Sequence, residues 1–176
     1  MYNKALFLDR DGTLILDKHY IKDPDDVEII PNAGDFLKTA KGLGYLLFMF
    51  TNQSGVSRGY YTFEDIALCN QKMLELLNLP EDFFTEICIA PESPTDPQIY
   101  RKPSPRFILE MIDKYDLDPK LSWMIGDHLN DLKAGINAGI NCAWVSTGKP
   151  RNEDIEDYIH EHSIPIFSQL SDLVIF

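Results

Sequence analysis

At 176 residues the chain is long enough to bury a hydrophobic core without disulfides or structural metals, and we expect one domain over residues 1–176. Its formal net charge of −12, with no basic stripe to offset it, argues against a nucleic-acid partner. No early apolar run is long enough for a signal peptide or a membrane span, and the three separated cysteines form no zinc or redox pair. We therefore expect a cytoplasmic, monomeric protein with no membrane partner.

Short apolar runs alternate with helical patterns along the chain. The apolar runs predict strands at 5–8, 45–50, 86–90, 123–125 and 142–145. The helical patterns predict helices at 32–43, 62–78 and 104–115, after Asp127, after Asn152 and near the C-terminus. Such alternation is typical of βαβ units, so the sequence predicts an α/β, Rossmann-like fold with a parallel sheet and helices on both faces.

Three of these helices carry clear end signals. Gly44 ends the first helix, and Thr62 with Asp65 forms a capping pair at the start of the second. Ser104 and Pro105 supply the cap and the first turn of the third helix. The second helix is expected to place one apolar face on the sheet, made of Phe63, Ile66, Ala67, Leu74 and Leu77.

Two carboxylates follow the first predicted strand. Asp9 and Asp11 come directly after its apolar residues, and Gly12 and Thr13 follow them. Because side chains alternate along an extended chain, both acids point to the same side. Asp and Gly are also ordinary turn residues, but two acids at the end of a wholly apolar strand favour a binding edge over a simple surface turn.

Polar segments follow the next three strands as well. They are 51–55 with its hydroxyl and amide groups, 101–103 with two cations, and 126–131 with two acids four residues apart. Each has an ordinary explanation on its own: a turn, a solvated surface pair, or an acidic helix cap. Their occurrence at successive strand ends favours one site at the carboxyl edge of the sheet, shaped by the long connections 17–31 and 91–103.

The two leading acids suit phosphate ester hydrolysis. Enzymes accelerate that reaction by up to about 10²¹-fold, of which alignment supplies roughly 7–11 kcal/mol. The remainder must come from a metal, from charge stabilisation and from a covalent route. Asp9 can attack phosphorus to give an aspartyl phosphate, while Asp11 protonates the leaving oxygen and later activates water. The pattern therefore indicates a phosphatase acting on a small soluble metabolite.

The other strand-end residues fit the same reaction. Mg²⁺ would neutralise the reacting anions, and Asp127 offers a further carboxylate for this hard ion. Thr51 and Lys102 are suited to hold the phosphoryl group. Asp131 is suited to orient either the metal-bound waters or Lys102.

These four motifs, in this order, resemble the haloacid dehalogenase (HAD)-like superfamily. Within it, residues 5–150 are most similar to the D-glycero-D-manno-heptose 1,7-bisphosphate 7-phosphatases, with the histidinol-phosphate phosphatases close behind. The resemblance implies a HAD-like fold with little or no cap domain, magnesium dependence, and a role in making the heptose precursor of the lipopolysaccharide core.

The resemblance also implies roles for individual residues. Mg²⁺ would be held by Asp9, by the backbone carbonyl of Asp11 and by Asp127, with Asp131 behind them. The position of His128 is commonly lysine in the family. The phosphorylated sugar would contact Asp17, Lys18, His19, Tyr20, Asn52, Gln53, Ser54, Arg101 and His128.

The segment before Arg101 departs from the family pattern. Many members hold it with a zinc ion bound by three cysteines and a histidine, whereas here only Cys88 could correspond. One thiolate does not make a tetrahedral zinc site, so we expect no zinc. Three prolines, Pro91, Pro94 and Pro97, are expected to stiffen the segment instead.

Other functions stay open at this point. A histidinol-phosphate phosphatase would share every catalytic residue and differ only in its substrate contacts. A dehalogenase of the same fold is disfavoured, because its chemistry has no use for Asp11. A catalytically silent phosphate-sensing protein is disfavoured because Asp9, Lys102 and Asp127 are all present.

Overall fold

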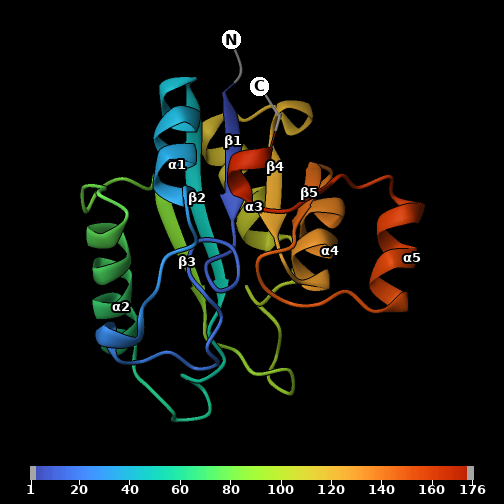
Figure 1. The fold of residues 1–176 in the computed structure, drawn as a ribbon. Coiled ribbons are helices and arrows are strands. Elements are labelled where there is room, and N and C mark those ends of the chain that lie inside the picture. The colour runs from blue at the N-terminus through green and yellow to red at the C-terminus, as the bar shows by residue number, and fades with distance from the viewer. Residues whose placement is uncertain (1–2, 174–176) are drawn as a thin grey trace.

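Six parallel strands form one sheet in the computed structural model, which describes residues 3–173. The strands are β1 Lys4–Leu8, β2 Tyr45–Asn52, β3 Glu86–Ala90, β4 Trp123–Gly126, β5 Asn141–Val145 and β6 Ile166–Phe167. Their order is β3-β2-β1-β4-β5-β6 (Figure 1). The expected α/β, Rossmann-like class is confirmed. The two-residue strand β6 was not expected, because two residues are too few to form a recognisable apolar run or an alternating pattern.

The helices follow the expected order. They are α1 Ala33–Gly42, α2 Phe63–Leu76, α3 Arg106–Tyr115, α4 Leu129–Ala138 and α5 Glu153–Glu161. Three short 3₁₀ helices accompany them: η1 Pro24–Asp26, η2 Pro119–Leu121 and η3 Leu170–Asp172. The helix expected near the C-terminus is η3, a single turn.

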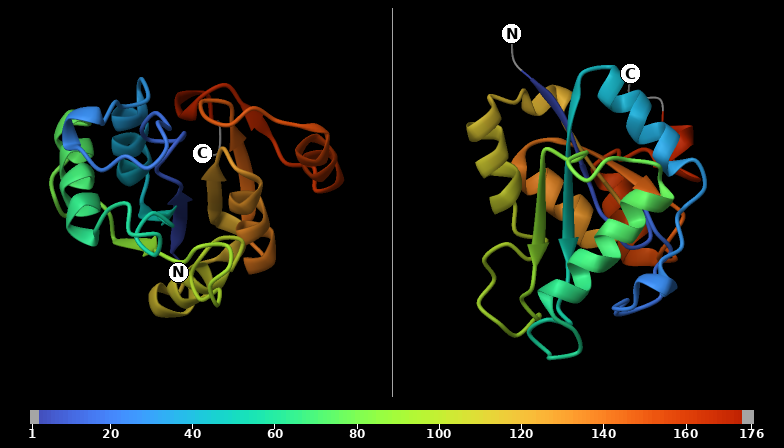
Figure 2. Two further views of the ribbon diagram at one scale, coloured as in Figure 1. Left: turned by 90° about the horizontal axis from the view of Figure 1, so that it is seen from below. Right: turned by 90° about the vertical axis from the view of Figure 1, so that its left-hand side faces the viewer.

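The helices lie in two layers, one on each face of the sheet (Figure 2). Within β1, Leu6 and Leu8 pack with α1 and α2, while Ala5 and Phe7 pack with α3 and α4. This alternation is the two-residue period of extended chain. It explains why every described residue of β1 after Lys4 is buried.

Two details of the helices differ from expectation. In α2, Phe63 and Ala67 are exposed, and the buried stripe passes instead through Cys69, Asn70 and Met73. The stripe includes a polar residue, so hydropathy alone misplaced it. In α3 the helix begins at Arg106, and Pro105 occupies the cap position without a side-chain cap bond.

The strand order places a topological switch point between β1 and β4. Leu8 lies opposite Met49 of β2 and Ile125 of β4, so β1 and β4 end nearly level, while β2 runs on to Asn52. At such a point the connections from the two neighbouring strands run in opposite directions, which leaves a crevice beyond the carboxyl ends of these strands. In Figure 1 these ends point down, toward the long connections.

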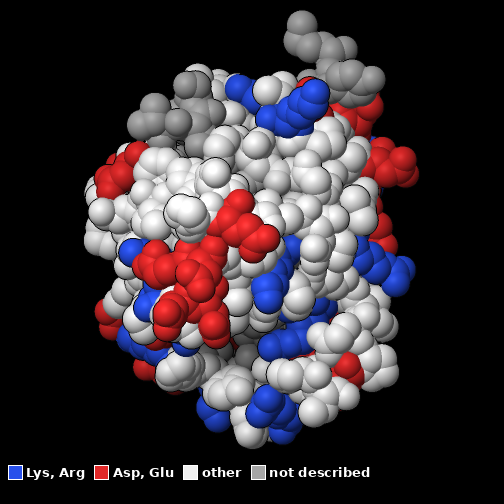
Figure 3. All heavy atoms as spheres, turned by 90° about the vertical axis from the view of Figure 1, so that its right-hand side faces the viewer, with Lys and Arg blue, Asp and Glu red and all other residues white. Residues whose placement is uncertain are grey.

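The surface is strongly acidic around α5. Figure 3 looks onto that side of the molecule, where acidic side chains gather in one patch. The first turn of α5 supplies Glu153, Asp154 and Glu156, all exposed. A surface of this kind repels phosphate backbones at long range. Within residues 3–173, no helix is both long and apolar enough to cross a membrane.

Candidate active site

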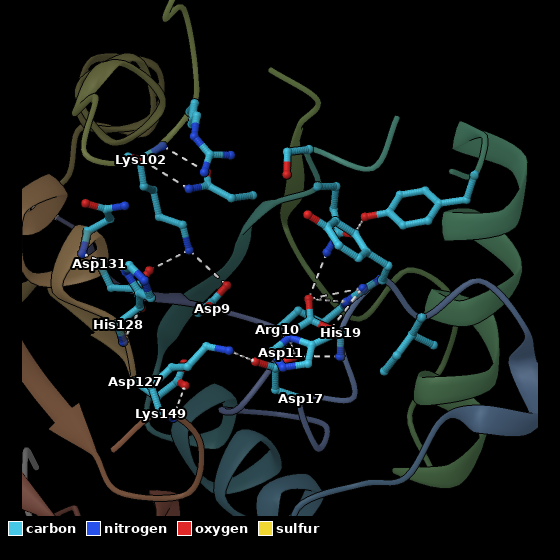
Figure 4. Close-up of a pocket in the computed structure, with 18 residues that line it drawn as sticks. Asp9, Arg10, Asp11, Asp17, His19, Lys102, Asp127, His128, Asp131 and Lys149 are labelled. Atoms are coloured by element: carbon cyan, nitrogen blue, oxygen red, sulfur yellow. Dashed lines mark hydrogen bonds and ion pairs between the residues drawn. The ribbon is translucent and has the colours of Figure 1, made fainter. Parts of the chain in front are cut away.

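A cavity of about 350 Å³ opens at the carboxyl edge of the sheet (Figure 4). Its size falls within the range of small-molecule sites. The strand ends of β1, β2 and β4 and the loops beyond them all contribute. The lining residues are Asp9, Arg10, Asp11, Asp17, His19, Tyr20, Ile21, Asn52, Gln53, Ser54, Tyr61, Arg101, Lys102, Asp127, His128, Asn130, Asp131 and Lys149.

Lys102 links two of the carboxylates. Its Nζ lies 2.9 Å from Asp9 Oδ1 and 2.6 Å from Asp131 Oδ1. It also donates to the Phe50 carbonyl at 2.7 Å, and the residue is 2% exposed. Asn52 fixes the backbone of Lys102 through a pair of hydrogen bonds of 2.9 and 3.1 Å. The ammonium is therefore held at the bottom of the cavity, as the proposed phosphate-holding role requires.

Asp11 is held by a different set of partners. Arg10 donates to both of its carboxylate oxygens at 3.1 Å, and Gln53 Nε2 donates at 2.8 Å. The Thr51 hydroxyl donates at 3.4 Å and itself accepts from Gln53. Arg10 is in turn anchored by Asn70 of α2 at 3.0 Å. The carboxyl group of Asp11 thus has a fixed orientation beside Asp9.

Backbone groups surround the carboxylate of Asp127. The Lys149 amide donates to its Oδ2 at 2.7 Å. Two glycines make room for the carboxylate, since a Cβ added to Gly148 would lie 1.9 Å from Oδ2 and one added to Gly12 would lie 2.3 Å away. Gly12 also has a φ of 82°, which an L side chain disfavours. Both neighbours of Asp127 are therefore required to be small.

Burial and mutual repulsion perturb these groups. Burial, followed by the charge of Asp131, raises the pKa of Asp9 to about 7, although Lys102 opposes the shift. Burial, followed by the charges of Asp9 and Asp131, raises the pKa of Asp127 to about 8. Burial lowers the pKa of Lys102, but the two carboxylates outweigh it, and the net pKa is raised. Lys102 therefore stays charged at neutral pH.

The charge count favours a divalent cation. Carboxylate oxygens of Asp9, Asp127 and Asp131 lie within 4.8 Å of one another. When all three are ionised, these carboxylates and one ammonium leave two negative charges among buried side chains, which Mg²⁺ would balance with the hard oxygen ligands it prefers. Asp131 both pairs with Lys102 and caps α4, which leaves Asp127 and the second oxygen of Asp9 better placed to contact such an ion.

These pKa shifts predict how pH affects the metal-free protein. Asp9 and Asp127 bind protons more tightly when folded, so the folded state loses stability as pH rises from 5 to 8, by up to about 1.4 kcal/mol per pH unit for each group. Urea unfolding in EDTA measures this slope. Asp127→Asn should make it shallower, and an unchanged slope would contradict the assignment. Mg²⁺ should stabilise the native protein more at pH 8 than at pH 6.

The structure gathers most of the predicted substrate residues around the cavity. Asp17, His19, Tyr20, Asn52, Gln53, Ser54, Arg101 and His128 all line it. Thr51 is fully buried beneath Asp11 and does not line the cavity. Lys18 also lies away from it, in an ion pair with Glu28. Lys18 therefore does not line this cavity, and its contact with the substrate stays a prediction.

His128 serves as the cap of α4. Its Nδ1 accepts from the Asn130 amide at 3.1 Å, and its own amide donates to Asp131 at 3.0 Å. Burial lowers its pKa, which favours the neutral imidazole. A neutral ring that accepts a backbone hydrogen bond differs from the lysine common at this position, since it offers the cavity no fixed charge.

The segment 91–100 is held by hydrogen bonds. Glu92 Oε1 accepts from the amides of Ile99 and Tyr100 at 3.1 and 2.7 Å, and its carbonyl accepts from Arg101 at 2.9 Å. Asp96 closes an inner turn by accepting from the Ser93 amide at 2.7 Å. Burial raises the pKa of the Cys88 thiol in β3 to about 12, which disfavours the thiolate that zinc needs. The absence of zinc stays a prediction.

Five lining residues were not predicted from sequence: Arg10, Ile21, Tyr61, Asn130 and Lys149. Arg10 holds Asp11, Tyr61 donates to Gln53 Oε1 at 2.7 Å, and Lys149 contacts Asp127. Lys149 follows β5, so the strand-end argument used for the other motifs would have found it. Arg10 follows β1 between the two acids, so the same argument could have found it, whereas Tyr61, in the loop before α2, gave no such signal.

The close approach at Gly148 gives a sharp prediction. Gly148→Ala should displace Asp127 and weaken Mg²⁺ binding by about tenfold or more, the usual effect of disturbing the support of a metal ligand. Isothermal titration with Mg²⁺ measures the change. Gly42→Ala, at the last residue of α1 with nothing within 4 Å of the added Cβ, is the matched control and should bind normally. Wild-type affinity in Gly148→Ala would refute the role given to this contact.

Comparison with known proteins places the chain. A family model described as HAD-hydrolase-like matches residues 99–173. The D-glycero-beta-D-manno-heptose-1,7-bisphosphate 7-phosphatase of Helicobacter pylori is 40% identical over 139 residues, covering 78% of this chain and 80% of the relative. The D-glycero-alpha-D-manno-heptose-1,7-bisphosphate 7-phosphatase of Photorhabdus laumondii is 34% identical and covers 95% and 96%.

Solved structures agree on the fold. The D,D-heptose 1,7-bisphosphate phosphatase of B. bronchiseptica, complexed with magnesium and phosphate, superposes with a TM-score of 0.82 at 24% identity, covering 97% of this chain and 94% of that one. A putative HAD-like phosphatase from Mesorhizobium loti gives 0.72 at 31% identity, covering 90% and 85%. Together with the two relatives, these matches show that the chain belongs to the HAD-like phosphatases, in the family that contains the heptose-bisphosphate 7-phosphatases.

Proposed function

We propose that this protein is a Mg²⁺-dependent phosphatase that removes the 7-phosphate of D-glycero-D-manno-heptose 1,7-bisphosphate, in the synthesis of the lipopolysaccharide core precursor. The observation that carries the chemistry is the buried set of Asp9, Lys102 and Asp127 beside Asp11 at one cavity. The names of relatives at 34–40% identity support the substrate. Monomeric state and cytoplasmic location stay predictions.

In the first step, an Asp9 carboxylate oxygen forms a bond to phosphorus while the bond to the sugar oxygen breaks. Asp11 gives its proton to that oxygen, and Arg10 and Gln53 keep its carboxyl group aligned for the transfer. Lys102 stabilises the charge on the phosphoryl oxygens from a fixed position. The product is an aspartyl phosphate on Asp9.

In the second step, water attacks the phosphorus of the aspartyl phosphate. Asp11, now a carboxylate, takes a proton from that water, and the bond between phosphorus and the Asp9 oxygen breaks. Inorganic phosphate leaves and Asp9 is regenerated. Mg²⁺ held by Asp9, the Asp11 carbonyl and Asp127 would supply charge neutralisation and orient the phosphoryl group. Removal of Mg²⁺ with EDTA should abolish turnover, and added Mg²⁺ should restore it.

The cavity wall supports a polar, phosphorylated sugar. Arg101 brings positive charge to the lining, since the ammonium of Lys149 is already paired with Asp17, while Asn52 and Gln53 add hydrogen-bonding groups. A sugar with a second phosphate could use both kinds of group. Histidinol phosphate carries an amine and an imidazole in place of hydroxyl groups, so it would meet the cationic side chains without a second anion.

A phosphate-release panel tests the substrate. Both anomers of the heptose 1,7-bisphosphate, histidinol phosphate and fructose 1,6-bisphosphate are compared with Mg²⁺ by kcat/KM. A preference of at least about tenfold for a heptose anomer is the expected result. A preference for histidinol phosphate would replace the proposed substrate, and binding of phosphate without turnover of any compound would favour the silent phosphate-sensing alternative.

A further inference from the structure

Lys149 contacts two parts of the site that are far apart in sequence, and we infer that it is a positioning residue that ties the cavity wall at 17–20 to the carboxylate of Asp127 (Figure 4). Its amide holds Asp127, and its ammonium pairs with Asp17. The inference rests on the proposed function, in which Asp127 contacts the metal and residues 17–20 contact the substrate.

The backbone half of this link is firmly placed. The Lys149 amide donates to Asp127 Oδ2 at 2.7 Å, and Gly148 packs against the same oxygen. One residue earlier, the Thr147 hydroxyl donates to the Gly12 carbonyl at 2.6 Å. The segment that follows β5 is thus fastened both to the turn after β1 and to the metal-facing acid. Substituting the Lys149 side chain leaves all three contacts available.

The side-chain half acts on a strained loop. Asp17 pairs with Lys149 through Oδ2 and accepts from the His19 amide through Oδ1 at 3.0 Å. His19 and Tyr20 both adopt left-handed backbone, with φ of 55° and 51°. Left-handed backbone is unfavourable for residues other than glycine and persists only where neighbours hold it. Asp17 supplies that hold from one side.

The Tyr20 ring contacts two tyrosines on the other side of the loop, and its centroid lies 6.2 Å from that of the buried Tyr61. The Tyr20 ring meets Tyr60 edge-on at 4.9 Å between centroids, and both rings are about half exposed. The ion pair between Asp17 and Lys149 is less exposed than these two rings. The Asp17 side chain is 18% exposed and the Lys149 side chain is 37% exposed. Burial raises the pKa of Asp17, but the Lys149 hydrogen bond and the His19 amide outweigh it, so the net pKa is lowered. Lys149 is therefore the charged anchor of the loop, beside the tyrosine contacts and the buried side chain of Ile21.

A double-mutant cycle tests this role. Lys149→Met and Asp17→Asn should each raise KM for the heptose bisphosphate by about tenfold, with kcat changed by less than about threefold. If both act through one tether, the double variant should be no worse than the more affected single variant. The Mg²⁺ concentration for half-maximal activity should not change, because the amide that holds Asp127 remains. Lys149→Arg should restore most of the loss.

A measurement without substrate separates the tether from the proposed reaction. Amide hydrogen exchange at residues 17–20 should rise equally in Lys149→Met and Asp17→Asn. Lys114→Met is the matched control, since it removes a similar ion pair, with Glu86, at the far end of the sheet, and it should change neither exchange nor KM. Unchanged exchange in Lys149→Met would overturn the tether even if the substrate proposal fails. KM effects that multiply in the double variant would instead assign both side chains to direct substrate contact.

Discussion

The Asp9→Asn protein is expected to lose at least about 10⁴-fold in kcat while keeping its fold, because an amide oxygen cannot form the aspartyl phosphate. Asn keeps the shape of Asp, and its Oδ1 can still accept from Lys102 at the 2.9 Å seen for Asp9. The substitution also removes one of the crowded carboxylates, so stability should not fall. Steady-state phosphate release and urea unfolding measure the two effects separately.

A direct assay of the covalent intermediate complements the kinetics. Acid-quenched wild-type protein incubated with substrate should carry a phosphoryl adduct detectable by mass spectrometry, and Asp9→Asn should carry none. Asp113→Asn, an exposed position on α3, is the matched control and should behave like wild type. An Asp9→Asn protein with full activity would rule out the covalent route and with it the role of Asp9 as nucleophile.

The parallel fold could be predicted from the sequence because each buried strand is a short apolar run. All five longer strands and all five α-helices were found, with ends shifted by up to two residues. The buried face of α2 was misplaced at Phe63 and Ala67 for a physical reason. Asn70 occupies the buried stripe to accept a hydrogen bond from Arg10, and a polar residue in that place breaks the apolar period.

The site could be predicted in part because parallel strands end at one edge. From the sequence alone, that rule predicts that Asp9, Thr51, Lys102 and Asp127 lie close together. It could not reveal which side chains fix them. The contact between Lys149 and Asp17 spans 132 positions along the chain, and it depends on the path of two loops that carry no period. Asp17 and His19 line the cavity, whereas Lys18 between them pairs with Glu28 instead. The residue types alone do not signal this difference.

Lys102→Met should damage both the activity and the stability of the protein. Met fills a similar volume but removes the ammonium that lies 2.9 Å from Asp9 and 2.6 Å from Asp131. We expect kcat/KM to fall by roughly 10³-fold, because the charge on the transferring phosphoryl group loses a fixed partner. We also expect the free energy of unfolding to fall by about 3–5 kcal/mol at pH 8, as when one member of a buried ion pair is lost.

The loss of stability should depend on pH in a direction that identifies its cause. Lys102 lowers the pKa of both Asp9 and Asp127, so its removal raises those values further. Below the raised pKa the carboxyl groups are neutral and need no counter-charge, and the loss should therefore shrink as pH falls from 8 to 5.5. Urea unfolding in EDTA at both pH values measures this, with Lys114→Met as the exposed control. An equal loss at both pH values would mean that Lys102 contributes packing rather than charge, and the electrostatic account of the site would have to be abandoned.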